Sequence, residues 1–75
     1  MRTIAEIARE IRATWKNVSP YAQPYLDAMR YLSDKNSTYF YDDATSVVLY
    51  FLSNAASWRG EDARRIKKEL RAVIA

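Results

Sequence analysis

Basic side chains gather in the last part of the chain, in the stretch SNAASWRGEDARRIKKELRAVIA. Residues 58–75 hold six of the twelve basic residues and three of the nine acidic ones, while residues 1–57 balance six against six. The whole formal net charge of +3 therefore resides in this segment. A focused positive face is what phosphate binding requires, because each contact releases a condensed counterion. Three cations lie opposite the apolar positions of the predicted helix and are the candidate nucleic-acid-binding residues: Arg64, Lys68 and Arg71.

The same stretch also has an interpretation that needs no ligand. A helix on the outside of a small bundle has one wet face, and Arg and Lys are good helix formers there. A helix-turn-helix is disfavoured, because a recognition helix reads bases with its N-terminal residues. Here those residues include Glu61 and Asp62, which would repel phosphates. A solvated face and a weak, sequence-independent nucleic-acid face both stay open.

A second candidate site is the aromatic stretch TYFYDD. Exposed aromatic side chains stack on bases or anchor a protein partner. We take Tyr39 and Tyr41, together with Arg59, as candidate partner-binding residues. In the alternative interpretation, Phe40 closes the end of the helical bundle and the tyrosines are half-buried with wet hydroxyl groups.

Several kinds of chemistry are not expected from this composition. The chain has no Cys and no His, which removes thiolate chemistry and the usual zinc ligands. Asp42 and Asp43 are adjacent, and adjacent residues on a helix do not face each other, so they are interpreted as helix-start residues. The longest apolar run, residues 47–52, is far shorter than the roughly 20 residues of a membrane helix. We therefore expect no enzyme, no catalytic residues, no cofactor, no metal, no small-molecule substrate and no membrane contact.

Helical periodicity predicts the elements that would position these residues. We expect a single all-α domain over residues 1–75, a small bundle of four helices at about 3–16, 21–32, 43–55 and 58–73, the second one short. Thr3 and Glu6 form a capping-box pattern at the first start. Asp42 and Ser57 are the expected caps of the third and fourth helices. Glu61 and Arg65 form a favourable (i, i+4) pair.

The segment SVVLYFL could alternatively be a buried strand. A helix is favoured because its apolar residues form a wide helical face, and because no second strand is available to pair with it. The apolar surface extends nearly all round this segment, which predicts that it is the central, most buried helix. Four residues at the centres of the apolar stripes should be buried together: Trp15, Phe51, Ile66 and Leu70.

Two stretches, WKNVSPYAQPYLDAM and YFLSNAASWRGEDARRIKKEL, resemble a group of small uncharacterised proteins encoded by phages, plasmids and integrated elements of Gram-positive bacteria. The resemblance covers most of the chain and is most specific from Trp58 to Leu70. The resemblance implies that the protein is located in a bacterial cytoplasm. The group has no established activity, so no residue role is carried over. The expected function is a non-enzymatic accessory or regulatory protein, such as an inhibitor, that binds a host or phage protein. The alternative is a nucleic-acid-binding module using the basic face of the last helix.

Overall fold

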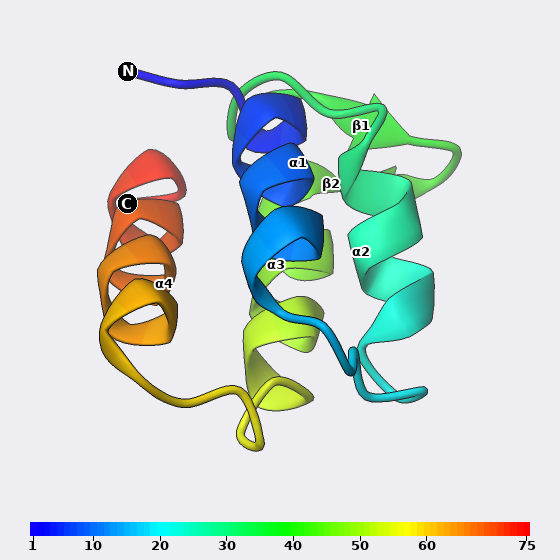
Figure 1. The fold of residues 1–75 in the computed structure, drawn as a ribbon. Coiled ribbons are helices and arrows are strands. Elements are labelled where there is room, and N and C mark those ends of the chain that lie inside the picture. Colours follow the sequence, from blue (N-terminus) through cyan, green and yellow to red (C-terminus); the bar gives the residue numbers. More distant parts are fainter.

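Four helices run alternately up and down in the computed structural model, which describes residues 1–75 (Figure 1). They are α1 (Ile4–Thr14), α2 (Gln23–Met29), α3 (Ala44–Ser53) and α4 (Glu61–Val73). α1 lies between α4 and α2, with α3 behind it (Figure 1). The four predicted helices are thus confirmed. The end of the last one at residue 73 is as predicted, and the other boundaries differ by one to three residues. None of them is long and apolar enough to cross a membrane.

A small hairpin corrects the all-α expectation, so the domain is mostly helical but not purely so. Strand β1 (Thr38–Tyr39) pairs antiparallel with β2 (Asp42–Asp43), which leaves Phe40 and Tyr41 as a two-residue turn. The pairing continues into α3, because the N–H of Ala44 donates to the carbonyl of Ser37 at 2.9 Å. Strands this short carry no alternating pattern that could reveal them in a sequence.

The first helix begins as predicted. The N–H of Glu6 donates to Thr3 Oγ1 at 3.1 Å, and the N–H of Thr3 donates to Glu6 Oε1 at 2.7 Å. The helix ends two residues earlier than predicted, because Trp15 already has extended backbone dihedrals. α2 is a single short stretch of seven residues, with Pro24 in its first turn as expected.

The segment SVVLYFL is helical, so the strand alternative is wrong. The cap of α3 is Asp43 and not Asp42: Asp43 Oδ1 accepts from the N–H of Ser46 at 2.7 Å. Asp42 lies one residue further from the helix, opposite Tyr39 in the hairpin, whereas Asp43 directly precedes Ala44. The apolar surface of α3 is not covered all round, since Leu49 and Tyr50 are about half exposed.

The core is built only from apolar side chains, and the four residues predicted to be buried together all lie in it. Trp15 meets the edge of Phe51 and stacks on Trp58, with ring centroids 5.3 Å apart and planes 8° from parallel. The stack holds Trp58 outside the last helix, which begins at Glu61 instead of residue 58. Gly60, not Ser57, is its N-cap, with a φ of 110° that favours glycine.

Candidate binding surfaces

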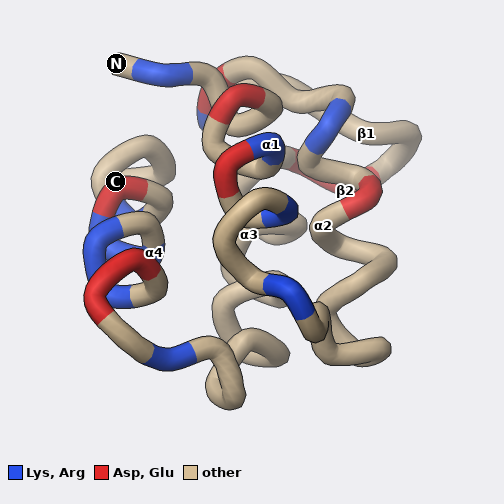
Figure 2. The backbone as a smooth tube through the Cα atoms, viewed as in Figure 1, with Lys and Arg blue, Asp and Glu red and all other residues tan.

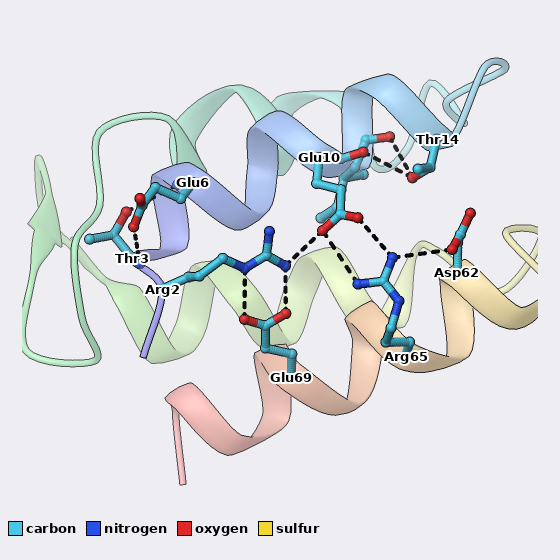
Figure 3. A network of polar contacts seen from close by, with 9 residues as sticks. Arg2, Thr3, Glu6, Glu10, Thr14, Asp62, Arg65 and Glu69 are labelled. Carbon is cyan, nitrogen blue, oxygen red and sulfur yellow. Dashed lines mark hydrogen bonds and ion pairs between the residues drawn. The ribbon is translucent and has the colours of Figure 1, made fainter.

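The two flanks of α4 differ in charge: one is neutralised by ion pairs and the other is positive. On one flank the charges are paired with α1 (Figure 3). Arg2 holds the Glu69 carboxylate with two hydrogen bonds, of 2.9 and 2.6 Å, and lies 2.7 Å from Glu10. Arg65 donates to Glu10 at 2.7 Å and to Asp62 at 3.1 Å. This ion-pair network fastens α4 to α1.

The network also determines which cations of α4 are neutralised. Hydrogen bonds from Arg65 and Arg2 lower the pKa of Glu10, and the hydrogen bond from Arg2 lowers the pKa of Glu69. The hydrogen bond to Glu10 raises the pKa of Arg65 further above its usual range. The expected pair of Glu61 with Arg65 is absent, because Arg65 reaches across to α1 instead. Arg65 is therefore a structural cation and not a free one.

The other flank of α4 carries cations without acidic partners. Four of them surround a hollow of about 350 Å³ whose lining contains no carboxylate. We call this the basic hollow and define it by its seven lining residues: Trp58, Arg59, Gly60, Ala63, Arg64, Lys67 and Arg71. None of its four cations lies within ion-pair distance of an Asp or Glu. Figure 2 shows basic residues along α4 and on the connection that leads into it.

Lys67 is the fixed member of the basic hollow. Its Nζ donates to the carbonyl oxygens of Ala55 and Trp58 at 2.8 and 2.7 Å, and lies 5.8 Å from the centroid of a Trp58 ring. Partial burial lowers the pKa of Lys67, and repulsion from Arg71 and Arg59 lowers it further. Lys67 thus closes the connection between α3 and α4 while adding charge to an already positive site.

The three predicted nucleic-acid-binding residues do not all lie at one site. Arg64 and Arg71 are exposed and lie together in the basic hollow. Lys68 is exposed too, but it lines a different hollow that also contains Glu61 and Asp62. Lys67, which also lines the basic hollow, is not among the residues predicted from the sequence. The available signal was the single glycine, Gly60, since it marks where the last helix begins, directly after Trp58 and Arg59.

Aromatic side chains gather on a different part of the surface, over α2, α3 and the hairpin. Tyr31 stacks on Tyr39 and Tyr25 leans against Tyr50, with ring centroids 5.5 Å apart in both pairs. Between the two helices lies a groove of about 600 Å³. We call it the tyrosine groove and define it by its lining: Pro24, Tyr25, Ala28, Tyr39, Asp42, Val47 and Tyr50.

The two residues at the hairpin tip, Phe40 and Tyr41, are the most conspicuous part of this surface. Phe40 is 82% exposed and Tyr41 is fully exposed. The alternative in which Phe40 closes the end of the bundle is therefore wrong. Phe40 also has a φ of 57°, and no other residue except glycine has a positive φ. Positive φ at the first turn residue alone matches a type II′ turn, where glycine is preferred.

The three predicted partner-binding residues do not form one site. Tyr39 is half-buried at the edge of the tyrosine groove, and Tyr41 lies at the hairpin tip. Arg59 lies at the opposite end of the bundle, on the connection into α4, where it lines the basic hollow (Figure 1). The molecule thus presents two separate surfaces, one aromatic and one basic.

No protein-family model, no curated protein and no solved structure matches this chain. The resemblance to mobile-element proteins stays a prediction.

Proposed function

We propose that this domain is a non-enzymatic binding protein that recognises another protein through the hairpin tip and the tyrosine groove. The observation that carries the proposal is Phe40, an aromatic residue with left-handed backbone and a side chain that is 82% exposed. A residue other than glycine in this conformation costs on the order of 1–3 kcal/mol. Such strain is typical of sites where an interaction outside the fold requires the residue.

Inside the molecule, an aromatic contact offsets part of that cost. The one aromatic contact of Phe40 is an edge-to-face contact with Tyr39, with centroids 4.7 Å apart. Such a contact contributes roughly 0.5–1.5 kcal/mol. Most of the ring is left for a partner to cover, and large aromatic side chains are the residues that most often dominate binding energy when they become buried.

The tyrosine groove indicates what kind of segment the partner would present. Tyrosine faces and the side chains of Ala28 and Val47 favour apolar or proline residues. Asp42 adds a carboxylate to the lining, and no basic side chain of this chain lies within ion-pair distance of it. A partner segment with apolar residues and one Lys or Arg would satisfy both features. From the resemblance to mobile-element proteins, we predict that such a partner is a protein of a bacterial host or a phage and that this domain is cytoplasmic.

A random-peptide display library, selected against the immobilised domain, tests this proposal. We expect selected peptides to combine apolar residues with one basic residue. They should bind the double variant Phe40→Gly, Tyr41→Ser at least tenfold more weakly than the parent. Tyr21→Ser is the matched control, because Tyr21 is 76% exposed but lies before α2, at the far end of that helix from the hairpin.

Glycine at position 40 suits the turn, so the double variant should keep its fold and melt close to the parent. A selection without enrichment would contradict the proposal. So would peptides that bind the hairpin variant as tightly as the parent, or that lose affinity equally with Tyr21→Ser.

A further inference from the structure

The basic hollow brings together four cations that have no acidic partner. Arg2, Arg12 and Arg65 each form an ion pair with an acidic side chain. Arg59, Lys67 and Arg71 have none, and they lie close enough for Arg71 and Arg59 to disfavour the charged form of Lys67. Bringing cations together without counter-charges costs free energy that a bound anion would recover.

The length of the hollow suits a chain of phosphates better than a single one. Arg64 and Arg71 are seven positions apart on one helix, so they are separated by about 10 Å along its axis. One strand of a nucleic acid carries a negative charge about every 3.4 Å of helix axis. The row of cations therefore spans about three phosphate spacings along the axis of a duplex, whereas a lone phosphate ion would reach only part of it.

The residues that line the basic hollow can contact phosphates but offer no aromatic face for stacking on a base. Trp58, the aromatic residue in the lining, is 4% exposed because it stacks on Trp15, so it offers no face to a base. Glu61 and Asp62, the acidic residues at the start of α4, do not line the basic hollow. They line the neighbouring hollow, which shares Arg64 with it and also contains Lys68. Glu61 and Asp62 would repel phosphates if α4 entered a nucleic-acid groove with its N-terminus first. This repulsion is avoided if the flank of α4 lies along the nucleic-acid backbone.

We propose that the basic hollow binds the phosphate backbone of nucleic acid without reading sequence, with Arg59, Arg64, Lys67 and Arg71 as the contacting residues. This site is separate from the aromatic surface, and neither proposal depends on the other. Sequence-independent binding of this type has a dissociation constant of about 10⁻⁴–10⁻⁶ M at physiological salt. If all four cations contact a duplex, the logarithm of the association constant should fall with the logarithm of salt with a slope of about −3.6.

Fluorescence anisotropy with labelled oligonucleotides of two unrelated sequences, single-stranded and duplex, is the test. Titrations at about 50 and 200 mM salt give the slope. The test variant is Arg64→Glu, Arg71→Glu. The matched control is Arg9→Glu, Lys16→Glu, which changes the net charge equally but on exposed α1-side residues without an ion-pair partner. Arg9 also lines a second, smaller basic hollow with Arg12 and Arg30, so the control tests that rival site as well.

We expect both sequences to bind alike, the test variant to bind at least tenfold more weakly, and the control to change by less than threefold. The slope should become shallower by about 1.8 in the test variant. Both variants should melt like folded domains, because all four reversed residues are exposed and none of them forms an ion pair. Equal losses in test and control would overturn the proposal in favour of a net-charge effect.

Three other results would also overturn it. One is displacement of the oligonucleotide by inorganic phosphate at low millimolar concentration, which would indicate a site for a free phosphate group. Another is tighter binding to phosphatidylserine-containing vesicles than to oligonucleotides at equal salt, which would indicate a membrane surface. The third is the absence of any binding at the lower salt concentration.

Discussion

Removal of the Leu70 side chain should destabilise the domain severely. Leu70 is 0% exposed and belongs to the single apolar core. Leu70→Ala removes its methyl groups and leaves a cavity, and such changes cost about 2–5 kcal/mol. A domain of 75 residues has a total stability of roughly 4–11 kcal/mol, at about 0.05–0.15 kcal/mol per residue. A central loss of about 3 kcal/mol should lower Tm by roughly 12–24 °C, since each kcal/mol shifts Tm by about 4–8 °C at this size.

Thermal unfolding followed by far-ultraviolet circular dichroism measures this shift, and the chain offers a matched control. Leu49→Ala is the same substitution on another helix at a position that is 50% exposed. The control should change stability far less, because much of its side chain is already in water. If the two variants melted within a few degrees of each other, Leu70 would not be a core residue and the packing of α4 described above would be wrong.

Two further predictions concern the ion-pair network and the cap of α3. The pKa values of Glu10 and Glu69 are lowered in the folded state, so their contribution to stability is fully present above the ordinary value of 4.5 and is lost as pH falls through their folded pKa values. Chemical denaturation at a series of pH values should show the free energy of unfolding falling below about pH 4.5. In the Glu10→Gln variant this fall should be smaller. An unchanged pH dependence in that variant would contradict the ion-pair network. Asp43→Ala should cost about 0.5–2 kcal/mol in the same assay, as expected for an N-cap, whereas Asp42→Ala should cost clearly less, and the reverse order would restore Asp42 as the cap.

Features with a local cause could be predicted from the sequence. The capping box at Thr3 and Glu6 depends only on residues three apart, and both of its hydrogen bonds are present. The burial of Ile66 and Leu70 follows from helical periodicity alone, because the stripe of apolar positions must face the core whatever it packs against.

Features that depend on distant residues could not be predicted. Arg65 has a suitable partner four residues before it, in Glu61, yet it binds Glu10, which lies 55 residues away and is brought close only by the packing of α4 on α1. The late start of α4 has the same origin, since the stack on Trp15 decides where Trp58 must lie. Asp42 and Asp43 are equivalent in the sequence, and only the hairpin makes one of them a cap.

The stacked tryptophans have an optical consequence. Trp15 and Trp58 are the only tryptophans in the chain and their rings are stacked, so all tryptophan emission comes from one place in the fold. Lys67 holds its ammonium group 5.8 Å from a Trp58 ring, and an anion near that ammonium would change the field at the ring. The six tyrosines are distributed elsewhere, four of them at the tyrosine groove or the stack beside it. Selective excitation of tryptophan therefore reports on the basic hollow without any added label.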